Sequence, residues 1–258
     1  MVDSVFMAEL SWPEFEAKMQ AGAPVFLPLG STEQHGPHSP LNVDVVLPTA
    51  VCERVARNIG GIVAPCVPYG AKSKPRSGGG EDFPGTISLD VVTFIHVVRD
   101  VVRALGRKGA RNIVVVVGHF ENGWPAVEGI DLAFRDLATE GITGMKIMRL
   151  EYWDFVTAQT LDKVFAPKAF PGTELEHASL VETSLMLLLE PRLVEMDKVP
   201  SDGPAQFPSY DIWPTPPGFA PPSGVLADAN GSSAEKGKLL MDDHVALITA
   251  AVTKEFGL

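Results

Sequence analysis

Short apolar runs alternate with amphipathic helical patterns over the first 190 residues, and this alternation constrains the fold more than any other feature of the chain. The runs are β-branched or uniformly apolar, as expected of strands that are covered on both faces. Between them, apolar residues recur at three- and four-residue spacing with charges on the other side, which is typical of helices packed on a core. Repeated βαβ units of this kind predict an α/β fold with a mainly parallel sheet and helices on both faces. The predicted strands are Val25–Leu29, Ile62–Val67, Ile113–Val117 and Met145–Leu150, and the predicted helices are Leu47–Ile59, Val91–Leu105 and Trp124–Leu137.

The length of 258 residues suits one large α/β domain, so we expect residues 1–258 to fold as a single unit. Residues 199–224, called the Pro-rich arm below, hold eight of the 22 prolines and predict a rigid extended segment. Two placements are open for this arm, a strap on its own core or an arm across a neighbouring subunit. The chain closes with a helical pattern over Ser233–Phe256.

The charge balance and the cysteines bear on partners and location. With 21 basic and 32 acidic residues, and no Lys/Arg cluster, the chain predicts neither a nucleic-acid partner nor a membrane partner. Cys52 and Cys66 lack the spacing of a disulfide framework or thiolate metal site, and we expect buried free thiols. Because the first residues lack a basic region followed by an apolar run, the expected location is the cytoplasm.

A polar cluster follows the first predicted strand. Glu33 and His35 are two residues apart, so in an extended segment both side chains point to the same side. Asp44 can return to them after the turn at Pro37–Pro40, and together the three suit a divalent cation. Taken alone, the cluster is equally compatible with Glu33 as a turn cap and His35 as a hydrogen-bonded loop histidine.

A second cluster follows the third predicted strand and favours the metal interpretation. His119 and Glu121 repeat the two-residue spacing of imidazole and carboxylate. Both clusters lie where the carboxyl ends of parallel strands gather ligands. Two imidazoles and three carboxylates exceed what one tetrahedral zinc requires and suit two metals bridged by a carboxylate. The predicted metal ligands are Glu33, His35, Asp44, His119 and Glu121.

A third group of polar residues, Glu174–His177, precedes a helical pattern over Ser179–Leu189. A histidine beside a carboxylate near a metal centre can shuttle the proton that a leaving nitrogen requires. Glu176 and His177 also suit the start of a helix, but the neighbouring clusters favour a catalytic role. His96 and His244 are expected to be ordinary helix residues, and nothing requires a role for His38, which is close to the first cluster.

At these motifs the chain resembles the creatininase (creatinine amidohydrolase) family over nearly its whole length. Several separated motifs occur in the same order, which makes the resemblance specific. The segments that carry it are Glu33–Gly36, Asn42–Ala50, Ser77–Gly80, Phe83–Thr86, Gly118–Asn122, Tyr152–Phe155 and Glu176–His177.

The resemblance implies a three-layer αβα sandwich, two divalent metal ions such as Zn and Mn, and a homo-hexamer in the cytoplasm. It implies hydrolysis of a small cyclic amide, creatinine to creatine or a related lactam or cyclic amidine, by a metal-activated water. Glu33 and His119 would hold one metal and His35 and Glu121 the other, with Asp44 as the bridge. His177 would transfer the proton, assisted by Glu176.

The resemblance also implies a substrate pocket, and here the chain departs from the creatinine-hydrolysing pattern. Ser77 and the backbone of Thr173–Leu175 (Thr173, Glu174 and Leu175) would line the pocket, with Trp153 on its wall. Where this chain has Phe120, Thr173 and Glu174, the pattern has Tyr, a Trp that covers the substrate, and Asp. This chain therefore lacks a hydroxyl that could hydrogen-bond the substrate and an apolar side chain that could cover it. A formamide or another non-creatinine amide is therefore the alternative substrate. A non-catalytic metal-binding member is disfavoured, because the proton-transferring pair is retained with all five ligands.

Overall fold

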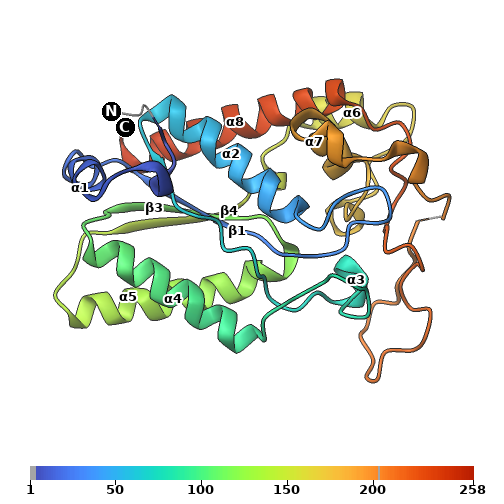
Figure 1. Ribbon diagram of the computed structural model, residues 1–258, viewed down its shortest axis with the longest axis horizontal. Coiled ribbons are helices and arrows are strands. Elements are labelled where there is room, and N and C mark those ends of the chain that lie inside the picture. The colour runs from blue at the N-terminus through green and yellow to red at the C-terminus, as the bar shows by residue number, and fades with distance from the viewer. Residues whose placement is uncertain (1–3, 203) are drawn as a thin grey trace.

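The computed structural model describes residues 4–202 and 204–258. Its centre is a four-stranded parallel sheet with the order β2-β1-β3-β4. Helices cover both faces of this sheet, which confirms the predicted fold class (Figure 1). The strands are β1 Val25–Leu29, β2 Ile62–Val63, β3 Asn112–Val117 and β4 Lys146–Glu151.

The predicted helices are present with bounds that differ by a few residues. The α-helices are α1 Trp12–Gln20, α2 Val43–Ile59, α3 Pro75–Gly78, α4 Val91–Arg107, α5 Gly123–Thr139, α6 Ala158–Phe165, α7 Leu180–Leu189 and α8 Ala234–Phe256. Short 3-10 turns occupy Met7–Glu9, Phe120–Asn122, Tyr152–Asp154, Thr173–Leu175, Pro191–Leu193 and Met196–Lys198.

Two elements differ from the sequence prediction in ways that matter. Strand β2 is shorter than the predicted Ile62–Val67, because Pro28 in β1 and Pro65 have no N–H to continue the ladder. Helix α2 begins at Val43, four residues before the predicted start. Asp44 therefore lies in the first turn of a helix, which fixes its direction more firmly than a loop would.

The sheet separates two apolar cores. Along β3, Val114 and Val116 pack with α2, α7 and α8, whereas Ile113 and Val115 pack with α4 and α5. This alternation is the two-residue period of a strand, and burial on both faces explains why the run reads as uniformly apolar. The arrangement leaves the carboxyl ends of β1 and β3 as the polar edge of the sheet.

The Pro-rich arm has no regular secondary structure in its described residues and runs along one edge of the molecule (orange in Figure 1). At its base, Ala205 N–H donates to Leu226 O at 2.8 Å, and Leu226 N–H donates to His177 O at 3.2 Å, so the two ends of the arm are joined to each other and to this chain's own core. Its tip is exposed, with Trp213 79% and Tyr210 63% accessible.

Cys52 and Cys66 are free thiols, as expected, although Cys66 is only partly buried. In the described ranges, the structure has no helix that is both long enough and apolar enough to cross a membrane.

Candidate metal centre and catalytic pocket

The first two polar clusters meet at the carboxyl ends of β1 and β3. Glu33 and His35 follow β1, His119 follows β3, and the first turn of α2 carries Asp44 between them. Gly30 and Gly118, the glycines at the two strand ends, allow the backbone of Asp44 to come close to both strands. A Cβ at Gly30 would lie 2.6 Å from Asp44 O, and a Cβ at Gly118 would lie 2.8 Å from the same atom.

The first set of donor atoms comes from Glu33, Asp44 and His119, all buried. His119 Nδ1 lies 2.9 Å from Glu33 Oε2 and 3.1 Å from Asp44 Oδ2. The other ring nitrogen, Nε2, donates to Ala71 O at 2.9 Å. Metal-binding histidines are commonly oriented in this way, by a carbonyl that accepts from the nitrogen opposite the metal.

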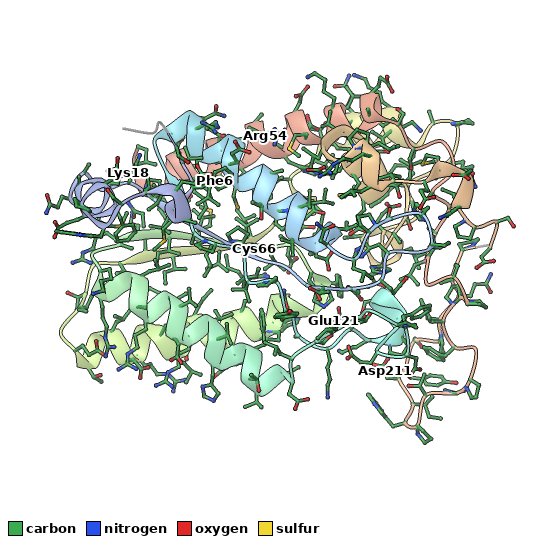
Figure 2. The ribbon with its side chains drawn as sticks, viewed as in Figure 1. Phe6, Lys18, Arg54, Cys66, Glu121 and Asp211 are labelled. Carbon is green, nitrogen blue, oxygen red and sulfur yellow. The ribbon has the colours of Figure 1, made fainter. Side chains whose placement is uncertain are left out.

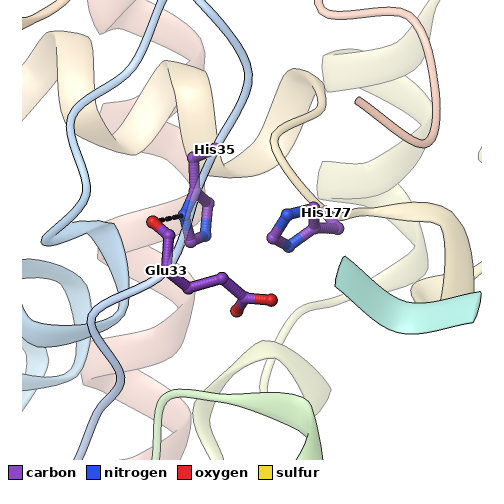
Figure 3. A group of neighbouring side chains, drawn as sticks. All are labelled: Glu33, His35 and His177. Carbon is purple, nitrogen blue, oxygen red and sulfur yellow. Dashed lines mark hydrogen bonds between the residues drawn. The ribbon is translucent and has the colours of Figure 1, made fainter. Parts of the chain in front are cut away.

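The second set comes from His35, Asp44 and Glu182. His35 Nδ1 donates to the backbone oxygen of Glu33 at 3.1 Å, the dashed contact in Figure 3. His35 Nε2 therefore faces Asp44 Oδ1 at 3.1 Å and Glu182 Oε2 at 3.6 Å. Because Asp44 turns one oxygen to each imidazole, it has the placement of a bridging carboxylate.

The residues present fit a pair of divalent ions. Three ligand-type atoms in this cluster, Glu33 Oε1, His35 Nε2 and Glu121 Oε2, are buried without a hydrogen-bond partner of good geometry. Buried polar atoms are normally paired, so unpaired ones that converge on one place indicate a missing partner. Imidazole and carboxylate donors suit Zn²⁺ and Mn²⁺.

The electrostatics of the cluster favour a cation. Burial disfavours the charged form of His35, but Asp44 and Glu182 outweigh it and raise its pKa well above the usual range. Burial likewise opposes the charging of His119, yet Glu33 and Asp44 raise its pKa. Burial would raise the pKa of Asp44, but His35 and His119 hold it well below its usual range. Burial raises the pKa of Glu33 to about 7 despite His119.

Glu121, the fifth predicted ligand, lies at the edge of this cluster and belongs to none of the three-residue donor groups found in the described ranges, one of which joins His177 to Glu33 and His35. Its Oε2 is 3.4 Å from His119 Nε2, while Oε1 accepts from Ser77 Oγ and, at 3.1 Å, from Lys74 N–H. Figure 2 shows Glu121 close to α3, the helix that carries Ser77. The structure thus places Glu182, and not Glu121, next to His35.

The two predicted proton-transferring residues lie on the far side of His35. The ring of His177 is 4.4 Å from the ring of His35, and Figure 3 shows it opposite Glu33 and His35. Burial, with His35 adding to it, lowers the pKa of His177 well below its usual range. Burial raises the pKa of Glu176 to about 8, although its Oε2 accepts from Val181 N–H at 2.9 Å. At neutral pH His177 is neutral and Glu176 is protonated.

A pocket of about 50 Å³ opens between the metal cluster and these two residues. Phe120 and Trp153 form one wall, with ring centroids 6.4 Å apart and planes at 21°. The predicted substrate residues Ser77, Phe120, Trp153, Thr173 and Glu174 all line the pocket. Leu175 does not, and lines a larger outer chamber of about 960 Å³ beyond it.

The other histidines lie outside the ligand sets. His38 is buried, with Nε2 3.0 Å from Thr183 Oγ1, and His96 is exposed on α4. His244 is buried in α8 and donates from Nδ1 to Phe155 O at 2.9 Å.

Three residues of the site were not predicted from the sequence. Glu182 lies in the first turn of α7, where an acidic residue normally indicates only a helix start. Asn122 is fully buried, accepts from Ala71 N–H at 2.8 Å and donates to the backbone oxygens of Leu29 and Gly30. Gln34 is the third, and its position inside the first motif was the only available signal.

Comparison with known proteins agrees with this geometry. The family model described as creatinine amidohydrolase matches residues 8–252. The creatinine amidohydrolase of Pseudomonas putida is 48% identical over 257 residues, which cover 99% of each chain. A solved creatininase in a Mn form is 47% identical, and a Glu-to-Gln creatininase variant of Zn–Zn type is 46% identical. Each superposes with a TM-score of 0.96 and covers 98% of this chain and 99% of its own.

The order of the motifs, the parallel sheet with its metal-type cluster and the match over residues 8–252 lead to one assignment. The chain belongs to the creatininase family of amidohydrolases.

Proposed function

We propose that this chain is a metal-dependent amidohydrolase that opens the ring of creatinine to give creatine. One observation carries the proposal, namely that Asp44 is shared by two sets of donor atoms beside a neutral His177 in a small pocket. The 48% identical relative named creatinine amidohydrolase supports creatinine as the substrate.

The proposed cofactors are two divalent ions, Zn²⁺ or Mn²⁺, as in the similar solved structures. Glu33, Asp44 and His119 would hold one ion, and His35, Asp44 and Glu182 are placed to hold the other. The family motif adds Glu121 as a further ligand of the second ion, and its buried Oε2 has no hydrogen-bond partner. Bound ions would supply Lewis acidity, which acidifies a water molecule and polarises the scissile carbonyl.

His177 carries out the proton transfers between the attacking water and the leaving nitrogen. A neutral imidazole can accept a proton from the attacking water as the new C–O bond forms. The same nitrogen then returns the proton to the leaving nitrogen as the C–N bond breaks, so no net proton is lost or gained. Glu176, protonated and fixed by Val181 N–H, holds the backbone next to His177.

The shape of the pocket supports a planar substrate. The stacked pair of Phe120 and Trp153 offers a flat apolar wall for a five-membered ring. Thr173 and Glu174 also line the pocket and offer a hydroxyl and a carboxylate for polar contacts.

We further propose that the chain is one domain that assembles as a homo-hexamer in the cytoplasm. Both apolar cores share the single sheet, which supports one domain. Exposed large aromatics, Trp124 at 85% and Trp213 at 79%, support burial in an oligomer. Light scattering on a size-exclusion column tests the hexamer.

The central test is a creatinine-to-creatine assay on metal-reconstituted enzyme, together with a panel of small lactams and formamides. We expect creatine formation that is lost in His177→Gln and retained in His96→Gln, a matched change on the exposed face of α4. Turnover of a formamide without creatinine turnover would overturn the substrate assignment. Activity that is unchanged in His177→Gln would overturn the catalytic assignment.

A further inference from the structure

Gln34 joins three segments that are far apart in the sequence. It lies between the metal-ligand candidates Glu33 and His35 in the sequence, and its side chain is buried. The amide nitrogen Nε2 lies 2.9 Å from Gly78 O, 3.0 Å from Gly224 O and 2.9 Å from His177 Nε2. One amide therefore contacts α3, the end of the Pro-rich arm and the catalytic histidine.

The orientation of this amide is fixed by its surroundings. Gln34 Oε1 accepts from Gly36 N–H at 2.8 Å, and Nε2 faces two backbone oxygens. Exchanging the oxygen and the nitrogen would place one oxygen against two others and leave the amide nitrogen against an N–H donor. The nitrogen must therefore be the atom that faces Gly78 and Gly224.

Counting hydrogens then determines the tautomer of His177. A primary amide nitrogen has two hydrogens, and the oxygens of Gly78 and Gly224 accept both. None is left for His177 Nε2. The backbone oxygen of Gln34 also lies 2.9 Å from His177 Nε2, and an oxygen of this kind can only accept. In the neutral ring the hydrogen is therefore on Nε2, and Nδ1 is bare.

We propose that Gln34 is a positioning residue that holds His177 in the Nε2-protonated tautomer and presents its bare Nδ1 to the substrate pocket. The backbone oxygen of Gln34 sets the tautomer, and its side-chain amide fastens α3 and the Pro-rich arm around the ring. The inference rests on the proposed function in one respect, because Nδ1 becomes the atom that takes the proton of water and returns it to the leaving nitrogen.

The end of the Pro-rich arm contacts this amide closely at Gly224. Gly224 has a φ of +75°, and a Cβ at this position would lie 2.2 Å from Gln34 Oε1 and 2.5 Å from Nε2. Gly218, in the same arm, has a nearly identical φ of +74° but no atom within 4 Å of such a Cβ. An alanine at either position bears the same backbone strain, whereas only an alanine at Gly224 pushes against Gln34.

The first test reads the tautomer without any turnover. Long-range ¹H–¹⁵N spectra of histidine-labelled protein, with His177 assigned by its loss in His177→Gln, should show a protonated Nε2 and a bare Nδ1. A protonated Nδ1 would overturn the proposal. In protein loaded with ¹¹³Cd²⁺, coupling to nitrogen is expected for His35 and His119, and coupling to His177 would show that Nδ1 binds metal instead.

The second test compares variants in creatinine turnover. Gln34→Met should lower kcat by about 10–100-fold, as is typical when a partner that orients a catalytic residue is lost, with two metals per chain retained. Gly224→Ala should lower kcat more than the matched control Gly218→Ala. Equal effects of the two alanines, or a Gln34→Met variant with the parental kcat, would contradict the proposal. If creatinine is not a substrate, the spectra still decide the tautomer, so failure of the function and failure of this inference are distinguishable.

Discussion

Gly118→Ala is expected to damage the metal centre through sterics alone. Gly118 follows β3 directly and is absent from the residues with positive φ, so alanine is compatible with its backbone. The added Cβ would lie 2.3 Å from Pro48 Cγ and 2.8 Å from Asp44 O, both on α2. Neither atom is the end of a flexible side chain, and therefore the first turn of α2 must move and carry Asp44 with it.

The size of the effect follows from the overlap. Overpacking of this kind costs about 1–3 kcal/mol. For a chain of this size a change of 1 kcal/mol shifts the melting temperature by roughly 2–4 °C, so we expect a fall of roughly 2–12 °C in metal-free protein. Because Asp44 faces both imidazoles, its displacement should weaken both metal positions together.

Two assays separate these consequences, calorimetry of metal-free protein for stability and chelator competition for metal affinity. The matched control is Gly123→Ala, where the Cβ would meet the ends of two flexible side chains, Glu151 Oε1 at 2.7 Å and Arg149 Nη1 at 3.4 Å. The control should shift the melting temperature by no more than roughly 2–4 °C, equivalent to about 1 kcal/mol. A Gly118→Ala protein with parental stability and parental metal affinity would refute the packing argument.

Four other predictions follow from the same site. Asp44→Asn should reduce the metal content measured by elemental analysis below two ions per chain and abolish turnover, because both donor sets share Asp44. Removing the metals with a chelator should lower the melting temperature by roughly 5–11 °C relative to protein at a hundredfold excess of metal over Kd, which corresponds to about 2.7 kcal/mol. Glu176 keeps its proton up to about pH 8 in the folded chain but loses it near its ordinary pKa of 4.5 in the unfolded chain. Its contribution to the free energy of unfolding is therefore full below pH 4.5 and is lost as the pH rises from 4.5 to about 8. Glu176→Gln should therefore gain stability over the parent between about pH 5 and about pH 9 in thermal melts of metal-free protein. Thr173→Trp should lower KM for creatinine by adding an apolar lid to the pocket, and an unchanged KM would show that Thr173 does not face the substrate.

The sequence was sufficient for the fold because the apolar pattern and the packing agree. The runs at Val25–Leu29 and Ile113–Val117 are buried on both faces, and their uniform apolar character was the correct signal for central parallel strands. The prediction was wrong at Val67, which forms only an isolated bridge to Leu29, because Pro28 in β1 and Pro65 after β2 interrupt the ladder.

The site was predictable where ligands are close in the sequence and not where they meet through packing. Glu33 and His35 belong to one motif, and His119 occupies the equivalent place after another strand. Glu182 approaches His35 only because α7 packs against α2, a contact that no local pattern encodes. Gln34 is similar, because both its carbonyl partners lie more than 40 residues away along the chain.

The two-metal site is measured most directly by a crystal structure of metal-loaded enzyme with anomalous scattering recorded at the Zn and Mn absorption edges. We expect two anomalous peaks about 3.5–4 Å apart on either side of the Asp44 carboxylate. One peak should lie among Glu33, Asp44 and His119, and the other beside His35. A single peak, or two peaks away from Asp44, would contradict the two-metal amidohydrolase described above.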